Sequence, residues 1–483
     1  MKVALFTLNG SWSHTSLALR CLRRPLERAG FSVELLEYSL RDRTSHVLEQ
    51  LYRAHADVYS FSCYIWNLTS MLELAQSLRQ ILPDAKIVLG GPEVSFGEER
   101  FATLPYVDAV ICGEGEEALP ELCQAFLDGA PYARVVHAAT ANVMTDEGIL
   151  YRKDDARASI LYYESSRGCP FRCAYCLSSL TQGVRFKSVA QTLSDLRAFE
   201  ELEGSGSIIK FVDRTFNADV GRANAIWRAL LDPSYTKRYH FEICASLLNE
   251  ESFEILAQFP KGKIQLEIGL QSTNEETLRA SSRHIDPHAV IAAVRRIHEM
   301  GNIHVHLDLI AGLPYESYTR FARSFDDAYG SCDLLQLGFL KLLHGTELRR
   351  RQEEYGYRCL PNPPYTVLAS KWMSYEEMTR LSHIAETLER VVESGRFSHA
   401  LYLLRAHVES PFAFFEGLTD YFKMVDPRPL QKISQPDVFR YFLQYAKEAV
   451  PSLPEEELVR MLALDFSIHE HKNPPSFLRL EIN

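Results

Sequence analysis

Two patterns of apolar and polar positions alternate over the first 140 residues. Short apolar runs that end in turn-forming residues predict buried strands at residues 3–8, 31–38, 58–63, 85–89 and 109–112. Apolar positions spaced three and four apart predict helices at residues 16–28, 68–82 and 118–127. Strands that alternate with helices indicate a parallel sheet covered on both faces. We therefore expect residues 1–140 to form a doubly wound, Rossmann-like domain.

A second alternation begins at Ile160, after a polar linker at residues 141–159 that includes the charged stretch 153–157. It predicts strands at residues 160–164, 208–212, 241–245, 264–270, 304–310 and 334–343. It predicts helices at residues 188–203, 223–231, 251–259, 274–282, 287–300 and 316–329. Six such units are too few for a closed eight-stranded barrel. Residues 160–346 are therefore expected to form a partial (β/α)6 barrel.

The pattern changes again after residue 346, where the strand signal ends. Pro361, Pro363 and Pro364 punctuate the boundary. Helical periodicity follows at residues 374–393, 398–409, 418–424, 435–448 and 455–464. Residues 347–483 are therefore expected to form a helical region, and the whole chain falls in the α/β class.

Three cysteines, Cys169, Cys173 and Cys176, stand in the run Ser165-Ser-Arg-Gly-Cys-Pro-Phe-Arg-Cys-Ala-Tyr-Cys176, directly after the first predicted barrel strand. This spacing lets one short loop supply three thiolates to a [4Fe–4S] cube, so that one iron keeps an open coordination position. A zinc site normally takes four Cys or His ligands, and the next cysteine, Cys244, falls on a predicted strand. Disulfides are rare in cytosolic chains. The pattern favours a cluster whose open iron takes part in chemistry.

Composition narrows the possible partners and location. The chain has 483 residues and a formal net charge of −11, which argues against a broad nucleic-acid footprint. No apolar run approaches the ~18 residues that a membrane span requires. The short apolar start at residues 1–8 ends at Asn9-Gly10 without a small-residue cleavage site, so it is interpreted as a strand. We expect a cytoplasmic protein that binds neither nucleic acid nor membrane.

The cysteine loop resembles that of the radical S-adenosylmethionine (radical SAM) family. The resemblance rests on the spacing CxxxCxxC, on Tyr175 just before the last cysteine, and on the position after the first barrel strand. It implies that the open iron binds SAM and that an electron from the cluster produces a 5′-deoxyadenosyl radical. The residues that the resemblance places near SAM are Tyr175, Asp213, Arg214, Glu242, Gln271, Ser272 and Ile310.

Four of these predicted SAM contacts each have an alternative role. Many family members carry Gly-Gly-Glu where this chain has Phe211-Val-Asp-Arg-Thr-Phe216, so Asp213 can instead cap the next turn. Arg214 can instead pair with a carboxylate. Glu242 can pair with an arginine, and Ile310 can be a core residue. Gly312 would let the backbone approach the adenine ring of SAM closely.

The doubly wound domain before the barrel resembles the cobalamin-binding branch of the same family. The resemblance covers roughly residues 1–345 and rests on Tyr59-Ser-Phe-Ser-Cys-Tyr-Ile-Trp-Asn67, Gly90-Gly-Pro-Glu93 and Val110-Ile-Cys-Gly-Glu-Gly-Glu116. The cobalamin contacts that it implies are Ser13, His14, Ser62, Trp66, Gly91, Pro92, Glu93, Gly113, Glu114 and Gly115. The Asp-x-His-x-x-Gly motif of many cobalamin domains does not occur. His14 is therefore a better candidate for a phosphate or substrate contact than for cobalt ligation.

The leading interpretation is a cobalamin-dependent radical SAM enzyme, most readily a methyltransferase that acts on an unactivated carbon of a small molecule. Its implied cofactors are a [4Fe–4S] cluster, SAM and cobalamin, and its implied partner is a reductant such as flavodoxin or ferredoxin. No catalytic residue is assigned beyond the cluster ligands. Two enzymatic alternatives stay open: a cyclase or rearrangement catalyst, and a radical SAM enzyme with a vestigial cobalamin domain. A non-catalytic iron–sulfur sensor is the alternative outside enzymes.

Overall fold

The computed structural model describes residues 1–141, 144, 148–153, 159–181, 183–202 and 208–479. The chain forms two compact units. The first contains Met1–Leu266, Lys341–Arg351 and Leu360–Thr366, and the second contains Glu267–Leu340, Gln352–Cys359 and Val367–Asn483. The predicted linker at 141–159 and its charged stretch 153–157 lie partly outside the described residues. The predicted boundaries at residues 140, 160 and 347 remain predictions.

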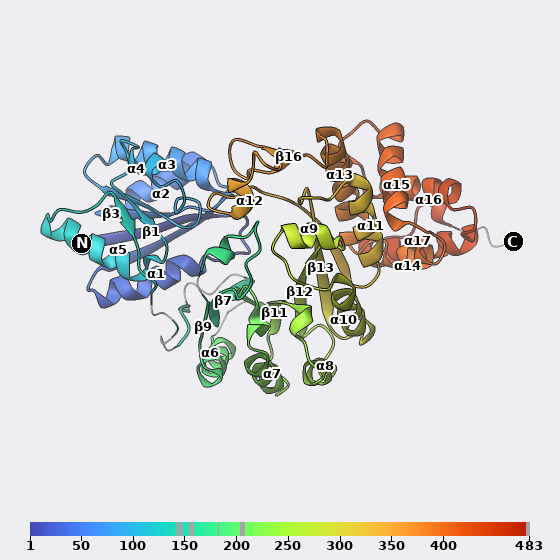
Figure 1. The fold of residues 1–483 in the computed structure, drawn as a ribbon, viewed down its shortest axis with the longest axis horizontal. Helices are drawn as coiled ribbons and strands as arrows, with labels where there is room; N and C mark the ends of the chain where they lie inside the picture. Colours follow the sequence, from blue (N-terminus) through green and yellow to red (C-terminus); the bar gives the residue numbers. More distant parts are fainter. Residues whose placement is uncertain (142–143, 145–147, 154–158, 182, 203–207, 480–483) are drawn as a thin grey trace. The chain divides into compact units, whose positions relative to one another are not determined.

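The first unit begins with a parallel sheet in the order β2-β1-β3-β4-β5-β6. Its strands are β1 (Lys2–Asn9), β2 (Ser32–Ser39), β3 (Val58–Ser62), β4 (Lys86–Gly90), β5 (Ala109–Cys112) and β6 (Val135–His137). Helices α1 (Leu17–Arg28) and α5 (Gly115–Asp128) pack on one face, and α2 (Thr44–Ala54), α3 (Leu68–Ile81) and α4 (Glu99–Ala102) pack on the other (Figure 1). The predicted Rossmann-like fold is confirmed.

Helix α2 is an element that the sequence pattern did not predict. Its N-cap is Arg43, which makes no side-chain capping hydrogen bond, so the usual start signal of a helix is missing. Only Val47, Leu51 and Ala54 of the helix are buried. Packing against the sheet therefore stabilises this helix where its local sequence signal is weak.

A second sheet has the order β14-β13-β12-β11-β10-β7. Its strands, in chain order, are β7 (Ile160–Tyr163), β10 (Ile208–Phe211), β11 (Arg238–Ile243), β12 (Ile264–Gln271), β13 (His304–Ala311) and β14 (Leu334–Phe339). The accompanying helices are α6 (Val189–Glu201), α7 (Val220–Ala229), α8 (Glu250–Leu256), α9 (Glu275–Ala280), α10 (Pro287–Glu299) and α11 (Tyr318–Ala328). This sheet confirms the predicted partial barrel.

Two features of this region differ from the expectation. A hairpin of β8 (Ser166–Gly168) and β9 (Val184–Phe186) flanks the cysteine loop, where no strand was predicted. Helix α6 ends at Glu201, and the predicted end at residue 203 lies outside the described residues.

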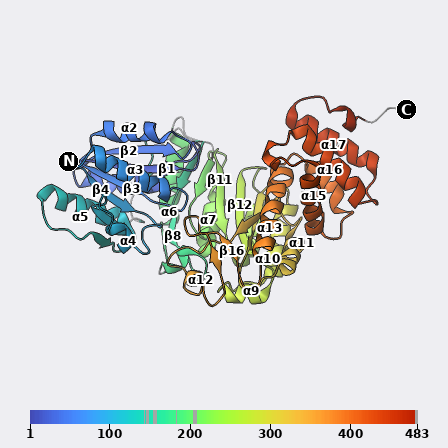
Figure 2. The ribbon, with the colours of Figure 1, turned by 90° about the horizontal axis from the view of Figure 1, so that it is seen from above.

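The C-terminal part of the second unit is helical, as predicted. It contains α13 (Tyr375–Leu388), a π-helical turn (Glu389–Glu393), α14 (Ser398–Arg405), α15 (Pro411–Val425), α16 (Gln435–Ala449) and α17 (Glu455–Glu470). Figure 2 labels α13, α15, α16 and α17. Helix α15 begins at Pro411, not at residue 418, because Ser410 caps it and Pro411 is favoured in a first turn. The short strands β15 (Arg358–Cys359) and β16 (Val367–Ala369) were not predicted, and neither was the short helix α12 (Glu347–Arg350) of the first unit.

Among the described residues, no helix combines the length and the apolar character that crossing a bilayer requires.

Candidate functional site

The three cysteines occupy a loop whose backbone is fixed at both ends. Gly168, just before Cys169, has φ +105°, and a Cβ atom there would lie 2.2 Å from the carbonyl oxygen of Gly183. Only glycine fits this close approach of the two hairpin strands. Within the loop, the Cys176 amide donates to the Cys173 carbonyl at 3.0 Å, and the Leu348 amide donates to the Ala174 carbonyl at 3.0 Å. The loop is therefore held in shape by the chain around it.

The donor set of this loop fits an iron–sulfur cluster. Cys173 is buried, Cys169 and Cys176 are half-buried, and all three are free thiols. Burial raises the pKa of the Cys169 thiol; charges on Cys176 and Cys173 raise it further, while a hydrogen bond with Thr215 opposes the rise. A metal cluster shared by the three residues would favour the thiolate forms, since metal binding stabilises thiolates.

Asp213 lies under the start of the cysteine loop. The side chain is fully buried and accepts hydrogen bonds from the Ser165 amide at 2.8 Å, the Ser165 hydroxyl at 2.6 Å and the Ser166 hydroxyl at 2.7 Å. Burial raises the pKa of Asp213, and these hydrogen bonds, together with the charge of Arg222, limit the rise. Asp213 thus fixes the end of β7 from which the loop departs. Its predicted contact with SAM remains a prediction.

Three other residues predicted near SAM also belong to the first unit. Tyr175 is half-buried within the cysteine loop, Arg214 is exposed at the end of β10, and Glu242 is half-buried on β11. The structure therefore brings these residues, Asp213 and the cysteines into one compact unit.

The remaining predicted SAM residues lie in the second unit. Gln271 has a left-handed backbone with φ 75°, and its buried side-chain carbonyl oxygen has no hydrogen-bond partner among the described residues. Non-glycine residues with such backbones cluster at functional sites. Ile310 is half-buried on β13, whereas Ser272 is fully buried and donates its hydroxyl to Glu316 at 2.7 Å.

Glu316 is a buried carboxylate that the sequence analysis did not single out. One oxygen accepts from the Ser272 and Ser324 hydroxyls at 2.7 and 2.8 Å, and the other has no partner among the described residues. Burial raises its pKa to about 7. The sequence presented Glu316 as the first residue of a helix, where acidic residues are common.

Glycines at the carboxyl ends of the N-terminal strands make tight backbone turns. Gly91, after β4, has φ +106°, and a Cβ atom there would lie 2.6 Å from the Cys63 carbonyl oxygen. Gly113, after β5, has φ +98°. Ligands of open α/β sheets bind outside these strand ends. At these two glycines no Cβ atom projects from the backbone, which leaves room for a large flat ligand at the strand ends.

The same edge presents aromatic rings. Trp66 is 51% exposed, stacks on Tyr64 with ring centroids 4.4 Å apart, and donates its indole N–H to the Leu8 carbonyl at 3.2 Å. Trp12, in the loop after β1, is 63% exposed. Exposed aromatic rings beside glycine turns fit the flat corrin ring of cobalamin.

The other predicted cobalamin residues lie in the same strand-end loops. Ser13 shares a hydrogen bond with Ser11 at 2.7 Å, and His14 Nδ1 lies 2.5 Å from the Tyr162 hydroxyl. The Ser62 carbonyl accepts from Thr7 and Asn67. Pro92 is exposed, and Gly115 begins helix α5.

Glu93 is buried, and it accepts a hydrogen bond from the hydroxyl of Tyr365, also in the first unit. Burial raises the pKa of Glu93, against the effect of this hydrogen bond. The side chain is thus engaged with the protein, and its contact with cobalamin remains a prediction.

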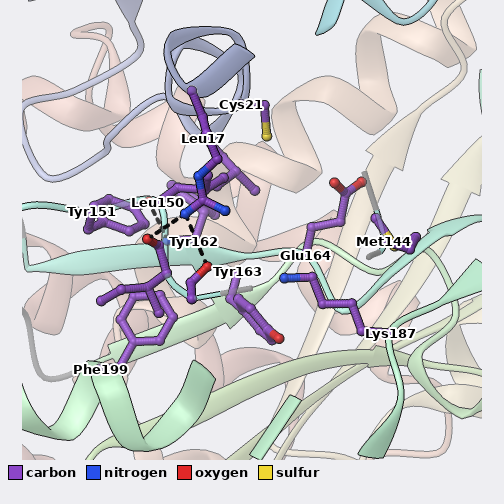
Figure 3. A pocket seen from close by; sticks show the side chains of 13 residues that line it. Leu17, Cys21, Met144, Leu150, Tyr151, Tyr162, Tyr163, Glu164, Lys187 and Phe199 are labelled. Carbon is purple, nitrogen blue, oxygen red and sulfur yellow. Dashed lines mark hydrogen bonds between the residues drawn. The ribbon is translucent and has the colours of Figure 1, made fainter. Parts of the chain in front are cut away.

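A pocket lies between helix α1 and strand β7 (Figure 3). Leu17 and Cys21 line it from the helix, and Tyr162, Glu164 and Lys187 line it from the barrel side. Two of these polar groups are already engaged, since Glu164 accepts from Arg167 and Lys187 pairs with buried Asp195 at 2.8 Å.

Three family models match separate parts of the chain. Residues 4–123 match the B12 binding domain, residues 163–328 match the Radical SAM superfamily, and residues 353–483 match a protein family of unknown function, DUF4080. The cysteine loop lies inside the second match. The chain therefore contains a B12 binding domain followed by a radical SAM domain. The resemblance to the cobalamin-binding branch of the radical SAM family, predicted from the sequence, is confirmed. The two matched domains also confirm the predicted cofactors, which are a [4Fe–4S] cluster, SAM and cobalamin.

Two curated relatives are about a quarter identical to this chain over the aligned residues. It is 26% identical over 438 residues to the 2-(S-pantetheinyl)-carbapenam-3-carboxylate methyltransferase of Streptantibioticus cattleyicolor, covering 76% of this chain and 61% of the relative. It is 26% identical over 439 residues to the cobalamin-dependent radical SAM methyltransferase TokK of Streptomyces tokunonensis, with the same coverage. The chain thus spans about three fifths of the length of these two relatives.

Solved structures share the fold at low sequence identity. The cobalamin-dependent S-adenosylmethionine radical enzyme OxsB, with aqua-cobalamin and SAM bound, aligns with a TM-score of 0.64 at 15% identity, covering 97% of this chain and 79% of that one. The radical SAM methyltransferase TsrM from Kitasatospora setae, with cobalamin and a [4Fe–4S] cluster bound, aligns with a TM-score of 0.62 at 17% identity, covering 75% and 78%.

Proposed function

We propose that this protein is a cobalamin-dependent radical SAM methyltransferase that acts on an unactivated carbon of a small molecule. The observation that carries the proposal is the loop of Cys169, Cys173 and Cys176, which belongs to the same compact unit as the B12-binding domain. The two relatives support methyl transfer, since both are methyltransferases. A third relative, the hopanoid C-3 methylase of Methylococcus capsulatus, is 24% identical over 326 residues.

The residues that would hold each group follow from the site. The three thiolates would ligate three irons and leave the fourth for SAM. The strand-end loops with Gly91, Gly113 and Trp66 would hold cobalamin. When bound, the cluster and SAM supply radical chemistry, and cobalamin supplies a methyl carrier.

The chain's own contribution begins with a rigid base for the cysteine loop. Asp213 binds the Ser165 amide and the two serine hydroxyls, and Arg222 donates to the carbonyls of Ser165 and Lys187 at 3.0 Å each. These bonds are buried, so breaking them would leave polar groups without water or partners. The base orients Cys169 without itself taking part in chemistry.

The proposal extends to the groups around SAM and to the electron supply. The side chains proposed to contact SAM are those of Tyr175, Asp213, Arg214, Glu242, Gln271, Ser272 and Ile310. We propose a flavodoxin or ferredoxin as the reductant and the cytoplasm as the location.

The proposal is tested by an anaerobic assay of the purified protein. The cluster is reconstituted with iron and sulfide, and hydroxocobalamin, SAM and a chemical reductant are added. We expect bound corrinoid absorbance and two SAM-derived products by mass analysis, 5′-deoxyadenosine and S-adenosylhomocysteine. Replacement of Cys169, Cys173 or Cys176 by alanine should abolish both products. The matched control is Cys123→Ala, which removes a buried thiol of helix α5 outside the loop and should leave both products unchanged.

Other outcomes favour the alternatives. 5′-Deoxyadenosine without bound corrinoid would indicate a radical SAM catalyst with a vestigial B12-binding domain. 5′-Deoxyadenosine with bound corrinoid but without S-adenosylhomocysteine would indicate cyclisation or rearrangement. A cluster without either product would indicate a sensor.

A further inference from the structure

Arg167, two residues before Cys169, is surrounded by three carboxylates. It donates to Glu164 through Nε at 2.8 Å and Nη2 at 2.7 Å. Its Nη2 also lies 2.8 Å from Glu116, and its Nη1 lies 3.1 Å from Glu114. All four side chains are at most 20% exposed. Charge-assisted hydrogen bonds of this kind are among the stronger ones in proteins.

Arg185 completes the group from the other strand of the hairpin. It binds Glu114 with both Nη atoms, at 3.1 Å through Nη1, and donates to the Ala141 carbonyl at 2.5 Å. The Ala141 amide donates back to Glu114 at 2.9 Å. Burial would raise the pKa of Glu114, but Arg185 and Arg167 lower it below its ordinary value. The carboxylate is therefore charged and held from several sides.

These side chains come from two different domains. Glu114 is the N-cap of helix α5 in the B12-binding domain, and Glu116 lies in the first turn of that helix. Arg167 belongs to strand β8, which leads into the cysteine loop. Both elements lie in the first compact unit. One guanidinium thus joins the loop proposed to hold cobalamin to the loop proposed to hold the cluster.

We propose that Arg167 is a positioning residue that couples the two cofactor loops, so that a cluster bound by the cysteines strengthens corrinoid binding at residues 113–116. The inference rests on the proposed function. Cluster ligation fixes Cys169 and so restricts Arg167, which then holds Glu114 and Glu116 in place. The cost of ordering these side chains is met once and shared by both ligands. By linkage, corrinoid must stabilise the bound cluster by the same factor.

Corrinoid affinity measured twice for each variant tests the coupling. The dissociation constant of hydroxocobalamin is determined by quenching of tryptophan fluorescence, once on chelator-treated protein and once on cluster-reconstituted protein, both anaerobic. For the wild type we expect at least about fivefold tighter binding with the cluster, which lies within the usual range of such couplings. For Arg167→Gln and Glu116→Gln we expect the ratio of the two constants to approach one.

Each variant is compared with itself, so a general structural defect that weakens corrinoid binding equally with and without the cluster leaves the ratio of the two dissociation constants unchanged. A change in this ratio therefore indicates a positioning role. Arg167→Lys keeps the charge but loses the planar fork, so it should restore part of the ratio. The control is Arg228→Gln, which breaks an exposed pair with Glu251 elsewhere in the first unit and should keep the wild-type ratio. The rate of iron release to a chelator supplies the reciprocal readout and should slow when hydroxocobalamin is bound.

Two results would overturn the coupling: a wild-type ratio of one, or an unchanged ratio in Arg167→Gln and Glu116→Gln. If Arg167→Gln does not fold, Glu116→Gln alone decides. Wild-type protein that binds no hydroxocobalamin in either form would instead contradict the proposed function, and the inference would fail with it.

Discussion

Two strand-end loops of this protein stabilise a carboxylate in opposite ways. The loop after β5 turns at Gly113, with φ +98°, and carries Glu114, which is paired with Arg167 and Arg185. These cations lower the pKa of Glu114 against the effect of burial. This carboxylate is charged at neutral pH.

The loop after β13 turns at Gly312, with φ +90°, and carries Glu316. Its hydrogen-bond donors are the hydroxyls of Ser272 and Ser324, and burial raises its pKa to about 7. A buried carboxylate needs either a cation or a proton. The charged state of Glu114 in the first loop therefore depends on its partners in another domain. The contribution of Glu316 in the second loop to stability depends on pH.

Removal of the shared cation should give the largest effect. Arg167→Gln leaves three carboxylates crowded together, and we expect a loss of about 3 kcal/mol in unfolding free energy, since breaking a mostly buried pair costs this much. Arg228→Gln, whose pair with Glu251 is exposed, should cost far less. Urea denaturation of the apo protein measures both. Equal losses in the two variants would contradict the central role of Arg167.

The pH dependence of Glu316 should give the next largest effect. Its folded-state pKa of about 7 lies above the unfolded value of roughly 4.3, so its contribution is complete below about pH 4.3 and is lost as the pH rises through 7. Between about pH 5.5 and about pH 8, the wild type should lose about 2 kcal/mol more than Glu316→Gln. Urea denaturation at the two pH values measures the difference.

The exposed Glu409→Gln substitution is the control for this experiment, and it should follow the wild type at both pH values. A pH dependence of Glu316→Gln that equals that of the wild type would show that another group titrates.

Substitution of the two glycines should give the smallest effect, and the loss of stability should be similar in the two loops. Gly113→Ala and Gly312→Ala should each cost about 1 kcal/mol, because both have a left-handed backbone. The added Cβ would meet the Ala138 carbonyl at 3.4 Å in the first loop and the flexible end of Met378 at 3.2 Å in the second, so neither contact dominates. Thermal unfolding measures both losses, and Gly10→Ala, with open space around it, is the control. A negligible loss at either loop position would contradict the conformational argument.

The sequence predicted the elements whose signal is local. Strand β5 was predicted with its observed bounds, because it is a short apolar run between turn residues. The cysteine loop was predicted because ligand spacing is a property of a single loop. Helix α2 was missed because it lacks a cap and is held by packing.

The contacts that organise the site could not be predicted in the same way. The ion pairs of Arg167 with Glu114 and Glu116 join residues about fifty positions apart, and no local pattern marks them. Glu316 has the same sequence context as a solvated helix start, and only the folded chain shows that it is buried against Ser272. Local spacing thus indicated the chemistry, whereas tertiary contacts determine how the loops are held.

The most direct test of the account is the iron content of anaerobically reconstituted protein in which Cys169, Cys173 and Cys176 are each replaced by alanine, compared with Cys123→Ala. The account predicts that each loop substitution abolishes the [4Fe–4S] cluster and SAM cleavage, while Cys123→Ala retains both. Loop variants that keep wild-type iron content and SAM consumption would contradict it.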